Sequence, residues 1–141
     1  MRRIIVLWLF LPLLFAGCAS TSGLLEDKAD GVSKKYRIPP EKARDAALGA
    51  LAWVDAYDIE EHKDAGCITA ELPVSAFSYG GVIAVWIEKS GTASSKVTVL
   101  TRRSLATTVG TPLTEEEFHE RFVKAAKIVR SGKRLPKEEP D

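Results

Sequence analysis

The sequence predicts an α+β domain: a helix, a four-stranded antiparallel meander and a second helix, with both helices packed on one face of the sheet. Three observations predict it. An alanine-rich apolar stripe follows Pro39 and Pro40, alternating apolar runs joined by short turns fill residues 57–102, and a capping box opens an amphipathic segment at Thr114. The predicted domain covers residues 38–132.

Pro39-Pro40-Glu41 is expected to open the first helix, because proline suits the first helical position and an acidic side chain in the first turn complements the helix dipole. Its apolar residues recur every three or four positions, which predicts one buried stripe. The stripe consists of Ala43, Ala46, Ala47, Ala50, Leu51 and Val54. Side chains this small favour a close approach of the helix to the sheet.

Residues 57–62 and 67–72 alternate on either side of a four-residue turn that ends in Gly66. A turn of this kind predicts a hairpin with a left-handed glycine. The expected register puts Tyr57 and Ile59 on the core face. Its pairs are His62 with Cys67, Ile59 with Ala70 and Tyr57 with Leu72.

The next two predicted strands, residues 82–88 and 95–102, differ in their faces. The first is apolar on both faces, with Ile83, Val85 and Ile87 on one and Val82, Ala84 and Trp86 on the other. The second is expected to point Val97 and Val99 inward, and Lys96, Thr98, Leu100 and Arg102 outward.

The last helix begins with the capping box Thr114-Glu115-Glu116-Glu117, in which Thr114 and Glu117 satisfy each other's backbone amides. Its apolar stripe is Phe118, Phe122, Ala125, Ala126 and Val129. Gly132 is expected to end the helix, and residues 133–141 are predicted to be a disordered tail.

The N-terminus has the three parts of a secretory signal peptide. Met1-Arg2-Arg3 is basic, residues 4–15 are apolar apart from Pro12, and small residues follow. The apolar run is shorter than the roughly 20 residues of a membrane-spanning helix. We therefore expect residues 1–17 to be cleaved.

The junction Leu14-Phe15-Ala16-Gly17-Cys18 resembles a bacterial lipobox. The resemblance implies cleavage before Cys18, diacylglycerol on its sulfur, and usually a third acyl chain on its amine. In Gram-negative lipoproteins an aspartate after the cysteine means retention in the inner membrane, so Ala19 implies the outer membrane, facing the periplasm. The alternative is an ordinary signal peptide with a coincidental cysteine. Residues 18–37 are predicted to be the lipidated cysteine and a flexible tether.

Composition excludes several classes of protein. Arg2 and Arg3 leave with the signal, so 18 basic and 19 acidic side chains remain, and no strong positive charge indicates nucleic-acid binding. Cys67 is the one other cysteine, so a disulfide framework is excluded. No sequence motif indicates a metal or other cofactor, because His62 and His119 lie on different elements and no glycine-rich phosphate loop is present.

Two groups of residues are candidates for function. His62 and Cys67, with Glu60 nearby, could form an activated thiolate. No oxyanion donor or family signature accompanies them, so the pattern favours a polar residue that flanks a turn beside a small strand residue. Trp86, Leu100 and Arg102 would form a partner surface if the helix-free face of the sheet is exposed. The alternative is that the tether, the C-terminal segment or residues 103–113 cover that face, and Phe77 and Tyr79 are further candidates.

The helix that ends near an aromatic residue, followed by a strand, a glycine turn and the strand Gly66-Cys67-Ile68-Thr69-Ala70, resembles helix-grip modules of small Gram-negative envelope lipoproteins. These include domains of lipoproteins of the β-barrel assembly machine. The resemblance implies an envelope role. We expect an interaction or scaffolding module with an envelope protein partner and no enzymatic activity. The alternatives are a lipid or small-molecule carrier, and a thiol-dependent enzyme using Cys67.

Overall fold

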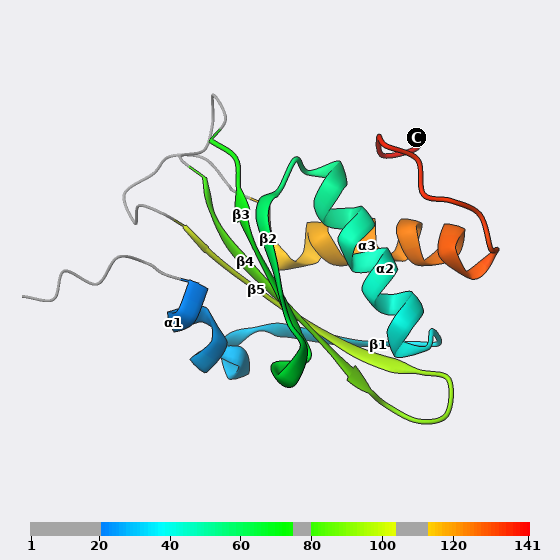
Figure 1. The fold of residues 1–141 in the computed structure, drawn as a ribbon, viewed down its shortest axis with the longest axis horizontal. Helices are drawn as coiled ribbons and strands as arrows, with labels where there is room; N and C mark the ends of the chain where they lie inside the picture. Colours follow the sequence, from blue (N-terminus) through cyan, green and yellow to red (C-terminus); the bar gives the residue numbers. More distant parts are fainter. Residues whose placement is uncertain (1–20, 75–79, 104–112) are drawn as a thin grey trace, which may run out of the picture.

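The structure is a computed structural model that describes residues 21–74, 80–103 and 113–141. It confirms the α+β class: a five-stranded antiparallel sheet carries two main helices that pack on each other and on one of its faces (Figure 1). The strand order is β1-β5-β4-β3-β2. In chain order the elements are α1 (Thr21–Glu26), η1 (Lys28–Asp30), β1 (Val32–Tyr36), α2 (Pro40–Trp53), β2 (Tyr57–His62), η2 (Lys63–Ala65), β3 (Cys67–Leu72), β4 (Gly81–Lys89), β5 (Ser95–Arg103) and α3 (Glu115–Arg130).

The main core lies between the sheet and the layer formed by α2 and α3. Four alanines of α2 are fully buried, as are Phe118 and Phe122 of α3. The four are Ala43, Ala46, Ala47 and Ala50. Both helices begin where the sequence predicts, and the Thr114 capping box is present. The predicted inward residues of β4 and β5 also lie in this core: Ile83, Val85, Val97 and Val99.

The sheet has one strand more than predicted, because the segment expected to be a tether is folded. β1 pairs with β5, from Val32 opposite Val99 to Tyr36 opposite Ser95. Gly31 permits this approach, since a Cβ atom there would lie 2.8 Å from Thr98 Cγ2. Two of the five residues of β1 are lysines, so the sequence pattern did not predict a strand there, although lysine is common on edge strands.

The β2–β3 hairpin keeps the predicted register only near its turn. His62 lies opposite Cys67 and Gly66 is left-handed, both as predicted. Beyond Glu60 a bulge shifts the register, so Tyr57 lies opposite Glu71 rather than Leu72. Asp58 takes a positive φ of 46° in this bulge. The prediction that Tyr57 and Ile59 face the core is therefore wrong: they are 46% and 39% exposed.

The C-terminal residues also differ from the prediction of disorder, since they pack against the helices. Leu135 lies beside Gly49 of α2, which has no side chain to occupy that space. Trp53 Nε1 donates to the carbonyl of Pro136 at 3.0 Å. Glu139 accepts from Arg121 and Lys124 of α3, both at 2.9 Å. A backbone acceptor and two cations thus fix a segment whose composition suggested disorder.

Candidate functional site

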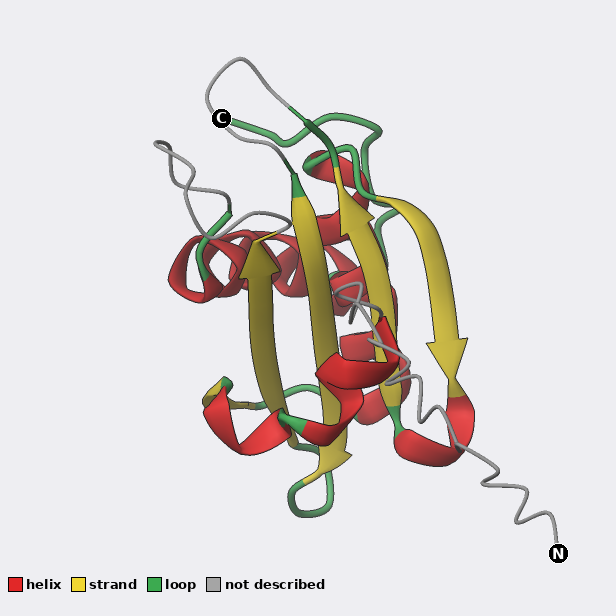
Figure 2. Cartoon of the chain, turned by 90° about the vertical axis from the view of Figure 1, so that its left-hand side faces the viewer, coloured by secondary structure: helices red, strands yellow, loops and turns green. Residues whose placement is uncertain are grey.

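The sheet face opposite α2 and α3 is covered by the segment just after the predicted lipidation site. Figure 2 shows α1 and η1 in front of the sheet and the main helices behind it. Leu24 of α1 packs into a second apolar cluster with Trp86 and Leu100. The other members of this cluster are Cys67, Val82 and Ala84.

This cover corrects the expectation that Trp86 and Leu100 form an exposed partner surface. Their side chains are 2% and 1% exposed. The residue pattern placed both correctly on the face away from α2 and α3. It did not show that six helical residues before β1 would close that face, because α1 is too short to carry a helical period.

Arg102, the third predicted surface residue, is exposed but already paired. Its guanidinium contacts Asp30 at 3.1 Å and Asp27 at 3.4 Å. On the same face, Lys28 contacts Glu88 at 2.7 Å. The residues next to the predicted anchor therefore bind the sheet by ion pairs around the apolar contact of Leu24.

Cys67 and His62 are opposite one another in the sheet, as predicted, but they do not form an activated pair. His62 Nε2 lies 2.9 Å from the hydroxyl of Thr69. The Cys67 thiol is buried, and this burial raises the pKa of Cys67 to about 12. At neutral pH the thiol is protonated, which is the opposite of what thiolate chemistry needs.

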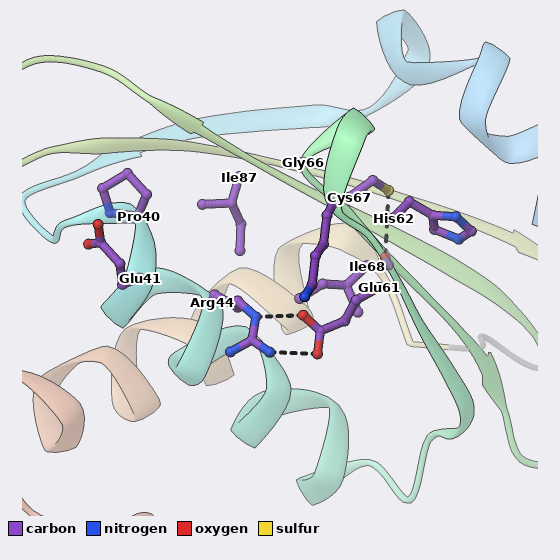
Figure 3. Close-up of a pocket in the computed structure, with 10 residues that line it drawn as sticks. Pro40, Glu41, Arg44, Glu61, His62, Gly66, Cys67, Ile68 and Ile87 are labelled. Atoms are coloured by element: carbon purple, nitrogen blue, oxygen red, sulfur yellow. Dashed lines mark hydrogen bonds and ion pairs between the residues drawn. The ribbon is translucent and has the colours of Figure 1, made fainter.

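A pocket of about 280 Å³ lies where the start of α2 meets the β2–β3 hairpin. Figure 3 shows Arg44 of α2 and Glu61 of β2 facing one another across it, with Ile68 and Ile87 nearby. The two side chains form a bidentate ion pair, with distances of 2.5 and 2.6 Å. The pair lowers the pKa of Glu61. Arg44 and Glu61 thus satisfy each other, while Glu41 and Lys63 are further charged residues in the lining of the pocket.

His119 is a buried polar residue whose role the sequence did not reveal. Its Nε2 lies 2.9 Å from the carbonyl oxygen of Val32, and its Nδ1 lies 2.8 Å from the Tyr36 hydroxyl. A carbonyl only accepts, so Nε2 carries the proton and Nδ1 accepts from Tyr36. Burial lowers the pKa of His119, which keeps the imidazole neutral. The histidine therefore fastens β1 to α3.

Cys18, the predicted lipidation site, lies outside the described residues, as do Phe77 and Tyr79. Within residues 21–74, 80–103 and 113–141, no group of three metal-binding side chains comes together. No helix in this part of the chain is long and apolar enough to cross a membrane.

Comparisons with known proteins found no match to the chain among protein families, curated proteins or solved structures.

Proposed function

We propose that the protein is a lipid-anchored envelope lipoprotein whose folded domain is a protein-interaction module. In this proposal the signal is cleaved before Cys18, and acyl chains on Cys18 hold the domain in the outer membrane on its periplasmic side. Two or more chains anchor a protein stably, whereas one holds it only marginally. The lipobox at residues 14–18 is the observation that carries the proposal.

The fold adds a geometric constraint to this anchor. Thr21, where α1 begins, is three residues after Cys18. An extended chain spans at most about 3.5 Å per residue, so three residues hold α1 within about 10 Å of the lipidated cysteine. Since α1 lies on the face opposite α2 and α3, the helix layer would point away from the anchoring bilayer (Figure 2). In this proposal the domain stays close to the bilayer, whereas a flexible tether of residues 18–37 would have let it reach partners farther away.

The two alternative functions gain less support. The Arg44–Glu61 pocket, at about 280 Å³, is slightly smaller than the roughly 300–1,000 Å³ typical of ligand pockets. Its facing charges are already paired, so they offer no free group to orient a ligand. A thiol enzyme would need an accessible thiolate, whereas the Cys67 thiol is buried and its pKa is raised to about 12.

The anchor is tested by expressing the wild type, Cys18→Ser and Cys67→Ala in a Gram-negative host. The wild type and Cys67→Ala should fractionate with the outer membrane, and their N-terminal peptides should carry acyl chains. Cys18→Ser should lack acyl chains and leave that fraction. If Cys18→Ser is retained like the wild type, the anchor proposal is wrong.

The interaction role is tested by crosslinking in the same cells. The wild type should give a discrete crosslinked adduct, and Cys18→Ser should give less of it, because anchoring raises the local concentration of the domain near its partner. A wild-type protein that is acylated but gives no adduct would contradict the interaction role and leave the anchor intact.

A further inference from the structure

A groove of about 530 Å³ runs between α3 and the connection from β1 to α2. Its sides come from segments far apart in the sequence: one is the end of β1 and the two residues after it, and the other is the C-terminal half of α3 with Ser131, which follows the helix. The residues that matter here are Arg37, Ile38, Val123, Ala126, Lys127 and Arg130. The four α3 residues recur at helical spacing, so they form one strip along the helix.

The groove is positively charged and carries no carboxylate in its lining. Within the described part of the chain, Arg37, Lys127 and Arg130 form no ion pair or side-chain hydrogen bond. Many other surface cations are paired, for example Lys34 with Glu116 and Arg44 with Glu61. Lys127 and Arg130 complement the negative end of the α3 dipole, but Arg37 lies on another segment and has no such role.

The groove also offers apolar surface between its charges. Ile38 is buried at 1% exposure, whereas Val123 is 50% exposed. Tyr36, whose ring packs on Phe122 with 4.8 Å between ring centroids, supports this side of α3. An exposed valine among three free cations suits a ligand that is both acidic and partly apolar.

A neighbouring strip of α3 shows how such a segment binds. There the chain's own C-terminal residues pack Leu135 against α2 and place Glu139 between Arg121 and Lys124. The acidic residue of this segment therefore binds α3, while its apolar residue packs on α2. The groove offers cations and an exposed valine on an adjoining strip of α3. This strip shares Lys127 with the surface beside the C-terminal Pro140 and Asp141, and no described residue fills the groove.

We propose that the groove binds an acidic, extended segment of a partner protein, with carboxylates on Arg37, Lys127 and Arg130 and an aliphatic side chain on Val123. This inference rests on the proposed role as an interaction module and assigns its binding surface. An anionic bilayer is the weaker candidate. In Figure 1, α1 follows the proposed anchor and lies at one end of the long axis, whereas the C-terminal end of α3 lies at the other end. The groove is therefore on the side of the domain away from the anchoring bilayer.

The test uses the purified lipidated protein in detergent and a fluorescent octapeptide of alternating Glu and Leu. The comparison peptides alternate Glu with Ser and Lys with Leu, and soluble glycerol phosphate, the charged headgroup of phosphatidylglycerol, represents an anionic lipid surface. The Glu–Leu peptide should bind at least about tenfold more tightly than either comparison peptide, because it alone satisfies both the cations and the valine.

The decisive variant is Arg37→Glu/Lys127→Glu/Arg130→Glu, which should weaken Glu–Leu binding by at least about tenfold. Its matched control is Lys42→Glu/Lys89→Glu/Lys137→Glu, which makes the same change in net charge at exposed positions outside the groove and should bind nearly as the wild type does. Val123→Glu, at an exposed residue, tests the groove with one substitution should the triple variant fail to fold.

Equal losses in the groove and control variants, or no binding of the Glu–Leu peptide, would overturn the inference. Groove-dependent binding of glycerol phosphate without peptide binding would overturn it in favour of lipid. In cells, the groove variant should stay acylated and membrane-bound but lose the crosslinked adduct. An adduct that persists in this variant would refute the groove and leave the interaction role standing.

Discussion

The two faces of the sheet are both apolar but are covered in different ways. One face packs against α2 and α3, which have 14 and 16 residues. The other packs against α1, which has six, and its cluster contains Trp86, Leu100 and Cys67. The first face therefore holds the fold together, whereas the second depends on a short segment adjacent to the predicted anchor.

The two covers also differ in what connects them to the rest of the chain. The helices α2 and α3 contact each other as well as the sheet, so removing a contact from one leaves other contacts in place. The cover on the Trp86 face relies on Leu24 and on the ion pairs of Lys28 and Arg102. Ion pairs this exposed contribute little to stability, so Leu24 is the main contact.

The largest expected effect is on the face under the main helices. Phe122→Ala should lower the free energy of unfolding by about 3–5 kcal/mol, because it removes a fully buried ring that packs on Tyr36. Urea denaturation followed by circular dichroism measures this loss. A loss below about 1 kcal/mol would mean that this face does not hold the fold together.

Leu24→Ala should have a smaller and more local effect. It should cost about 2 kcal/mol, at the low end for a buried leucine, because one side of the cluster is a short helix. Opening of α1 exposes Cys67, so alkylation of that thiol should accelerate by roughly tenfold or more while the main core stays folded.

The matched control for Leu24→Ala is Val74→Ala, at a side chain that is 69% exposed, and it should leave the alkylation rate unchanged. If Leu24→Ala accelerates alkylation only as far as it promotes global unfolding, the two faces are not separable.

The strand β1 follows α1 and η1 in the chain and is joined to α3 through His119. The pH dependence of stability tests this connection. Folding lowers the pKa of His119, mainly through burial, so the unfolded chain binds the proton more tightly. Stability from His119 is therefore complete above the unfolded pKa of about 6.5 and falls as the pH drops below it, by at most about 1.4 kcal/mol per pH unit. The neighbouring titratable groups are Tyr36, Lys34, Glu115 and Glu116.

His119→Gln should remove this component, since glutamine stays neutral across that range. Urea denaturation of both proteins at pH 7 and pH 5 measures the difference. The same pH dependence in both proteins would show that the imidazole does not titrate with folding.

Local patterns predicted much of this fold. The Thr114 capping box, the alanines of α2 and the two apolar faces of β4 each follow from spacing over a few residues. Those signals depend on neighbours in the chain, so they can be recognised without the tertiary structure.

The errors arose where tertiary contacts override composition. β1 contains two lysines in five residues, and it forms because β5 offers an open edge and Gly31 permits a close approach. Since β1 was missed, the covered position of Trp86 was only an alternative, and the position of Arg37 opposite α3 could not be predicted. The strip from Val123 to Arg130 is visible in the sequence, but its facing arginine is not.

Hydrogen exchange of the full-length protein shows whether the residues next to the predicted lipidation site are part of the fold. The amides of residues 32–36 that bond to β5 should be protected, and those of Leu24 and Leu25 should exchange more slowly than in an unstructured peptide. Leu24→Ala should reduce protection in α1 and leave that of β4 intact. Exchange across residues 21–36 at the rate of an unstructured chain would contradict the account.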